Sequence, residues 1–150
     1  MHKKRIDAKA EILERRQHVL DDPEAVELVG VIDESVLRRT VGGKDVMGDQ
    51  LRALLDAAER PNITVQVIPT SLGAHPAQTN PYDLLEFRKI PAAVHLPQHE
   101  DHGFVTAEDR VQDYQRLTRL LCSEAQPPEE SLRMITAAAE RMGSTVGRQC

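Results

Sequence analysis

Apolar residues recur at alternating four- and three-residue steps in several stretches of the chain, which is the spacing of one face of an α-helix. The first stretch predicts an amphipathic helix over residues 6–20, whose stripe consists of Ile6, Ala10, Leu13, Gln17 and Leu20. Comparable stripes predict helices over about 44–60, 107–123 and 129–142. We expect Thr106 to cap the third of these helices, since a threonine hydroxyl can accept a hydrogen bond from the first helical turn.

Other stretches carry runs of apolar and β-branched residues, which are typical of β-strands. The run at 25–32 is nearly continuous and predicts a strand covered on both faces. With the helix at 44–60 and the run at 63–68, it forms a βαβ unit, whose two strands should be parallel. The runs at 82–87 and 92–96 are so close along the chain that they predict an antiparallel pair.

These elements predict an α+β fold. We expect an α/β sandwich with a small mixed sheet of about four strands, containing one βαβ unit and one antiparallel pair, with amphipathic helices at both ends. The chain has 150 residues, the size of one domain. We therefore expect a single domain over residues 1–143 and a disordered tail at 144–150.

The composition of the chain limits the classes of partner that it is expected to bind. A formal charge of −5 argues against direct binding of nucleic acid, which needs a basic surface. The apolar runs are much shorter than a membrane span, so no membrane association is expected. The basic start is followed by charged residues instead of an apolar stretch, which argues against a signal peptide and for the cytoplasm. Two cysteines provide neither a disulfide framework nor a metal motif.

The densest group of candidate functional residues lies between positions 95 and 102, where half of the six histidines occur. It consists of His95, His99, Glu100, Asp101 and His102. Histidine beside a carboxylate can exchange protons near neutral pH, so the three histidines are candidate acid–base catalysts. A zinc site would need convergent ligands, and Pro97 argues against the helix that would supply them. A solvated polar loop is the plainer interpretation, and we expect no metal and no cofactor.

A second candidate site follows the first predicted strand. Asp33 and Glu34 stand at its carboxyl end, where α/β sheets usually place ligands, and Arg38 and Arg39 follow within about one turn. These four residues could bind a ligand, or form only a surface ion pair. Glu34 or Asp33 could also act as an alternative base. His75 lies in a long loop and is a candidate ligand contact, with a local hydrogen bond as the alternative.

Several blocks of the sequence together are similar to one known family. The blocks are Val31–Arg39, Val41–Gly43 through Gln50–Leu51, Ala58–Pro69, Gly73–Pro76, Leu84–Phe87, the helix containing Tyr114, and Pro127–Ser131. Over about residues 10–140 the chain resembles the uncharacterised domain that follows the helix-turn-helix in many actinobacterial Xre-type, antitoxin-like regulators. The resemblance implies a domain that senses a small molecule or protein partner and signals to DNA-binding residues.

The sequence also departs from that family. Members carry an upstream helix-turn-helix and a Pro-Gly-Leu-Leu-Gln-Thr-like motif, and this sequence lacks both. In relatives, one strand ends in a Tyr-Val-Glu-like sequence, whereas the corresponding residues here are His95-Leu96-Pro97. We therefore expect a stand-alone ligand- or partner-binding domain that serves specialised metabolism or its regulation. The alternative is a repurposed cofactor-free enzyme, a cyclase, isomerase or hydrolase of natural-product biosynthesis. Dimerisation through the first helix is a further open alternative.

Overall fold

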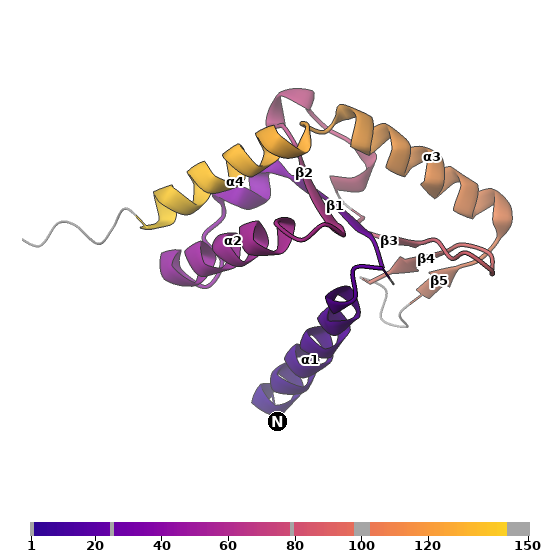
Figure 1. Ribbon diagram of the computed structural model, residues 1–150, viewed down its shortest axis with the longest axis horizontal. Helices are drawn as coiled ribbons and strands as arrows, with labels where there is room; N and C mark the ends of the chain where they lie inside the picture. The colour runs from indigo at the N-terminus through magenta and orange to yellow at the C-terminus, as the bar shows by residue number, and fades with distance from the viewer. Residues whose placement is uncertain (1, 25, 79, 98–102, 144–150) are drawn as a thin grey trace, which may run out of the picture. The chain divides into compact units, whose positions relative to one another are not determined.

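The computed structural model describes residues 2–24, 26–78, 80–97 and 103–143, and these residues form both helices and strands (Figure 1). The chain divides into two units. The described residues of 1–30, 40–65 and 132–150 form unit 1, and those of 31–39 and 66–131 form unit 2. The α+β class is confirmed, while the predicted tail at 144–150 lies outside the described residues. No helix in the described ranges is long and apolar enough to cross a bilayer.

The predicted βαβ unit is confirmed by β1 (Leu28–Asp33), α2 (Lys44–Ala58) and β2 (Ile63–Ile68). The two strands form a parallel pair, in which the Leu28 N–H donates to the Asn62 carbonyl over 2.8 Å. Leu28 and Val29 are exposed, so the expectation of a strand covered on both faces is wrong at its start. A continuous apolar run does not show where pairing begins, and here β1 begins only at Leu28.

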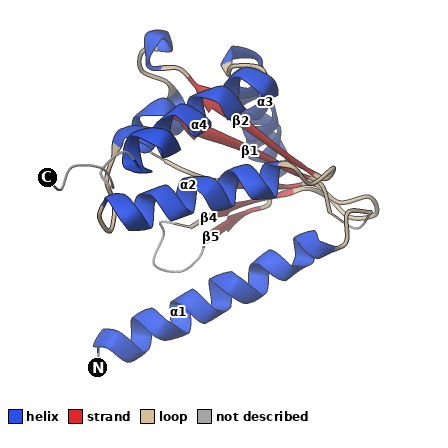
Figure 2. Ribbon diagram, turned by 60° about the vertical axis from the view of Figure 1, so that its left-hand side comes forward, coloured by secondary structure: helices blue, strands red, loops and turns tan. Residues whose placement is uncertain are grey.

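Helices α2 and α4 (Pro128–Gly143) approach each other closely within unit 1. Figure 2 shows them running side by side. At Gly48 of α2, an added Cβ would lie 3.3 Å from Cβ of Met142, so glycine permits the close approach. Gly43, with φ of +90°, precedes α2 as its N-cap residue. The buried apolar side chains of the two helices are Met47 and Leu51 on α2, and Ile135, Ala138, Ala139 and Met142 on α4.

The segment between the first helix and β1 is held by a buried polar side chain. Asn62 is buried, and its Nδ2 donates to the carbonyls of Leu20 and Val26, each over 3.0 Å. Two hydrogen bonds satisfy the amide and offset the cost of burying it. Asn62, the residue before β2, thereby fixes the path of the chain into β1.

Helix α1 (His2–Gln17) and the short 3₁₀ turn η1 (His18–Asp21) cover the predicted helix at 6–20. Ile12 and Leu13 of this helix are 65% and 57% exposed. Its apolar stripe is thin, and few large side chains are available to bury. Dimerisation through α1 stays a prediction.

Unit 2 contains a three-stranded antiparallel sheet in the order β3 (Asp83–Leu85), β4 (Ala93–Leu96) and β5 (Gly103–Val105). The predicted antiparallel pair is confirmed and gains β5 as a third strand. The described strands therefore form two sheets instead of one mixed sheet. One face of β3–β5 carries Leu84, Val94 and Val105, which pack with Val111 of α3 (Glu108–Glu124).

Helix α3 begins one residue later than the predicted cap implies. Ala107 is the N-cap residue and makes no side-chain cap bond, so the prediction for Thr106 is wrong. The first helical hydrogen bond runs instead from the Val111 N–H to the Ala107 carbonyl over 2.9 Å. The acidic Glu108 and Asp109 occupy the first turn, where their negative charges interact favourably with the positive end of the helix dipole. They stabilise the start of the helix without a hydroxyl cap.

The turn from α3 into α4 is tied to the end of β2. Gln126 N–H donates to the Val67 carbonyl over 2.8 Å, and the Val67 N–H donates to Oγ of Ser131 over 2.9 Å. Nearby, Ile68 is buried with Leu121 and Ala125 of the same unit. The contacts fix α3 over the segment that follows β2.

Candidate functional site

Asp33, the last residue of β1, is bonded to the segment that follows β2. Its Oδ2 lies 2.8 Å from Nε2 of His75, and its Oδ1 accepts the Ser35 N–H over 2.8 Å. The side chains of His75 and Asp33 are 7% and 15% exposed. The structure thus brings together two residues that the sequence analysis proposed separately.

Glu34 makes a second connection to the same segment. Its Oε2 accepts both the backbone N–H and the hydroxyl of Thr70, over 2.8 and 2.9 Å. Its Oε1 accepts a hydrogen bond from Nη2 of Arg38 over 2.7 Å. We call Asp33, Glu34, Thr70 and His75 the strand-end clamp, since together they hold the start of this segment against the end of β1.

Electrostatics fixes the direction of the hydrogen bonds in the clamp. Burial raises the pKa of Asp33, but hydrogen bonds from Ser35 and His75 outweigh it and leave the pKa below its ordinary value. Hydrogen bonds from the Thr70 backbone and from Arg38 lower the pKa of Glu34. Both carboxyl groups are therefore ionised at neutral pH and can only accept.

His75 consequently donates its Nε2–H to Asp33, which leaves Nδ1 to be satisfied. This atom is buried and has no hydrogen-bond partner among the described residues. A buried polar atom without a partner is rare and costs stability. Through these hydrogen bonds, the clamp holds the start of the segment after β2 against the end of β1.

Arg39 does not join this cluster. Its backbone N–H donates to the Val36 carbonyl over 3.4 Å, and its exposed side chain has no bond to any residue the structure describes. Of the two predicted arginines, only Arg38 contacts a predicted carboxylate.

His95 belongs to a different contact group, on the β3–β5 sheet. Its Nδ1 lies 3.0 Å from Oδ2 of Asp83, the residue opposite it on β3, and its ring centroid lies 5.0 Å from that of Phe104 on β5. His99 and His102, with Glu100 and Asp101, lie outside the described residues. Within the described part of the chain, no three histidine, cysteine or acidic side chains gather as a metal site would require.

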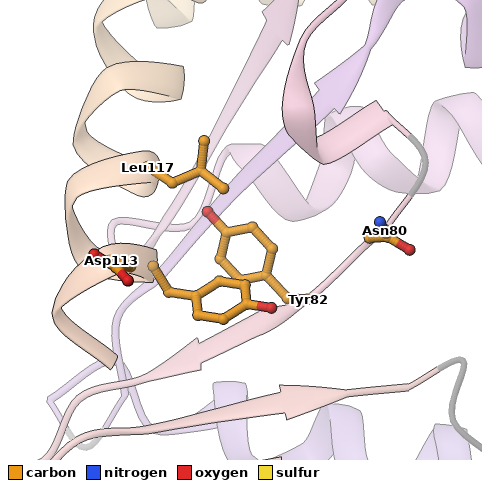
Figure 3. A pocket seen from close by; sticks show the side chains of 5 residues that line it. Asn80, Tyr82, Asp113 and Leu117 are labelled. Atoms are coloured by element: carbon orange, nitrogen blue, oxygen red, sulfur yellow. The ribbon is translucent and has the colours of Figure 1, made fainter. Parts of the chain in front are cut away.

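A pocket of about 200 Å³ lies between α3 and the segment that leads into β3 (Figure 3). Asp113 and Leu117 project from α3, and Asn80 and Tyr82 come from the other wall. Tyr114 completes the lining. Both tyrosines of the chain thus line one small pocket.

The two tyrosine rings are held in a fixed arrangement. Their centroids are 4.8 Å apart, and the rings meet edge to face at 62°. The Thr118 hydroxyl donates to the Tyr114 carbonyl over 2.8 Å, so it must accept the hydrogen of the Tyr82 hydroxyl, 2.7 Å away. Burial raises the pKa of Tyr82 above its ordinary value.

The sequence patterns do not predict this pocket. They place Tyr82 in a strand and Tyr114 in a helix, and they give no indication that Asn80, Asp113 or Leu117 line a site. The available indication was the scarcity of aromatic residues, since the chain has only two tyrosines, two phenylalanines and no tryptophan. The clamp and the pocket are consecutive features of the chain, because the segment that the clamp holds leads to Asn80 and Tyr82.

The comparisons with known proteins give one match. A family model described as a domain of unknown function, DUF5753, matches residues 1–137. No curated protein and no solved structure matches the chain.

Proposed function

The chain belongs to the DUF5753 family, whose function is unknown, and from this premise we propose that it is a non-catalytic module that binds a small molecule in the pocket beside α3. One observation carries the proposal. Two tyrosine rings, one leucine and two polar side chains surround about 200 Å³ of space. Apolar walls with a few polar groups are the usual composition of a small-molecule site.

The strand-end clamp supports binding in this pocket. It fixes the start of the segment that carries Asn80 and Tyr82, through Thr70 and His75. A wall that is already ordered loses little conformational entropy when a ligand arrives. In this proposal, Asp33, Glu34 and His75 therefore act by positioning the pocket wall and do not touch the ligand.

The resemblance to the domain of Xre-type regulators supports a sensing role. In our proposal the module works in the cytoplasm, and the bound ligand changes its interaction with a protein partner. A role in specialised metabolism or its regulation is part of the same proposal. Direct binding of nucleic acid by these residues is not included, since the chain carries a formal charge of −5.

A pocket-filling substitution tests the function. Asn80 and Gln78 are both exposed, so Asn80→Trp can block the pocket while Gln78→Trp places the same side chain outside the pocket lining. Each purified chain is incubated with a metabolite extract, separated from unbound compounds and examined by mass spectrometry. We expect the wild type and Gln78→Trp to retain a compound unchanged, and Asn80→Trp to lose it. Equal retention by all three chains would refute binding in this pocket.

The pair of His95 and Asp83 favours the alternative of an acid–base enzyme. A carboxylate that orients an imidazole is a recurring element of such sites. In the same incubation, the alternative predicts that a compound is converted by the wild type and not by His95→Gln. Conversion of this kind would replace the binding proposal, whereas unchanged extract with retained compound supports it.

A further inference from the structure

We infer that the pocket selects a small organic cation, an ammonium group on a compact apolar body. This inference rests on the proposed function, and it adds the chemical class of the ligand. It follows from three features of the pocket: the hydrogen-bonding character of Tyr82 and Asp113, the electron-rich faces of the tyrosine rings, and the volume of the pocket.

The polar atoms at the pocket favour a ligand that donates hydrogen bonds. The Tyr82 hydrogen is committed to Thr118, so the phenolic oxygen can only accept from a ligand. The Asp113 carboxylate is likewise an acceptor. An ammonium group, with up to three N–H donors and a positive charge, matches this set.

Asp113 already has a partner, the guanidinium of Arg116 one turn along α3. The two side chains are 68% and 61% exposed, and exposed ion pairs of this kind contribute less than about 1 kcal/mol. A carboxylate has two oxygens, so a ligand can share it with Arg116 or displace that arginine at small cost. An anionic ligand would instead have to approach the negative charge of Asp113.

The rings of Tyr82 and Tyr114 add a second attraction for positive charge. The face of an aromatic ring is electron-rich and attracts a cation placed over it. Leu117 supplies an aliphatic surface for the uncharged part of the ligand. The volume of about 200 Å³ is below the roughly 300–1,000 Å³ of pockets that hold drug-sized ligands. The ligand is therefore a small amine.

Three probes of similar size and different charge test this inference on the full chain: benzylamine, benzyl alcohol and benzoate. Because the chain has no tryptophan, its intrinsic fluorescence comes from Tyr82 and Tyr114, and both line the pocket. Titration at neutral pH and low salt should show a saturable change with benzylamine. We expect affinity for benzyl alcohol to be lower by about fivefold or more and benzoate to give no saturation.

A matched pair of variants locates the effect. Asp113→Asn removes the charge at the pocket, and Asp49→Asn removes the charge of an equivalent exposed pair, Asp49 with Arg52 on α2. We expect Asp113→Asn to weaken benzylamine about fivefold and to leave benzyl alcohol unchanged. Asp49→Asn should bind all three probes like the wild type. Both positions are exposed, and circular dichroism checks that each variant folds.

The outcomes separate this inference from the proposed function. Equal affinity for benzylamine and benzyl alcohol, tighter binding of benzoate, or no response to any probe would overturn the choice of an organic cation. An unchanged affinity in Asp113→Asn would do the same. The proposed function survives each of these results if Asn80→Trp still abolishes retention of a metabolite, and it fails only if that retention is unaffected.

Discussion

His75 donates its Nε2–H to Asp33 across 42 residues of sequence, over 2.8 Å, in an environment where both side chains are largely buried. The chain contains the same pair of residue types in an exposed setting. His18 and Asp21 lie 3.1 Å apart, with side chains that are 76% and 57% exposed. Comparing the two pairs isolates what burial adds to a histidine–carboxylate contact.

We predict that His75→Ala lowers the free energy of unfolding by about 1–3 kcal/mol, because it removes a buried hydrogen bond and leaves Oδ2 of Asp33 without that donor. The matched variant His18→Ala should change it by less than about 0.5 kcal/mol. Urea titration followed by circular dichroism measures both. Equal losses in the two variants would show that the buried pair does not hold the segment after β2.

Parts of the clamp could be predicted from the sequence. The spacing of Glu34 and Arg38 fits a pair one helical turn apart, and the end of β1 was recognised as a place for polar contacts. The bonds from Thr70 and His75 could not be predicted, because they depend on where the segment after β2 comes to rest. No periodic pattern encodes that position, since it is set by tertiary packing.

Among the strands, too, some features could be predicted from the sequence and others could not. Ile63–Ile68 was predicted with the bounds that the structure has, because proline ends the preceding helix and the run is β-branched. The three-residue strand β5 was missed, since Gly103–Val105 is too short to show alternation. The pocket requires residues of α3 to meet residues of the segment that leads into β3, and the sequence pattern predicts each element without showing which side chains face each other.

The clamp also predicts a response to acid. Hydrogen bonds lower the folded-state pKa of both Asp33 and Glu34 below the ordinary value of about 4. Their contribution to stability is therefore present above that value and is lost as pH falls through the lower folded-state pKa. We expect Glu34→Gln to be less stable than the wild type at neutral pH, with the difference shrinking as the pH falls below about 4.

Thr70→Val provides the companion to this measurement, because it removes the hydroxyl donor and keeps the backbone donor to Glu34. The pH at which the wild type loses stability should move upward in Thr70→Val. Urea titrations at a series of acidic pH values give both results. A constant difference between Glu34→Gln and the wild type at every pH would contradict the predicted role of the ionised carboxylate.

Ser131 yields a prediction about the attachment of α4. Its side chain is buried, and its Oγ accepts the Val67 N–H over 2.9 Å and donates to the Gln126 carbonyl over 3.1 Å. Ser131→Ala should destabilise the chain by about 1–3 kcal/mol, since the Val67 N–H is left without a partner in a buried place. Ser123 is exposed and bonds only to the Leu120 carbonyl of its own helix, so Ser123→Ala should be nearly neutral. Thermal unfolding followed by calorimetry compares the two, and a neutral Ser131→Ala would show that water replaces the hydroxyl.

The pocket gives the chain a sensitivity to alkaline pH. Burial disfavours the charged phenolate of Tyr82 and raises its pKa above the ordinary value of about 10. The folded chain therefore holds this proton more tightly than the unfolded chain does. The resulting stability is present below the ordinary pKa and is lost as pH rises through the folded-state pKa.

Near-ultraviolet absorbance records tyrosinate directly in a chain without tryptophan. The part of the titration that disappears in Tyr82→Phe should have its midpoint above about 10, and this variant should lose less stability than the wild type between neutral and alkaline pH. A midpoint at or below the ordinary value would mean that the Tyr82 hydroxyl is open to water, and the pocket wall would then be looser than the bond to Thr118 implies.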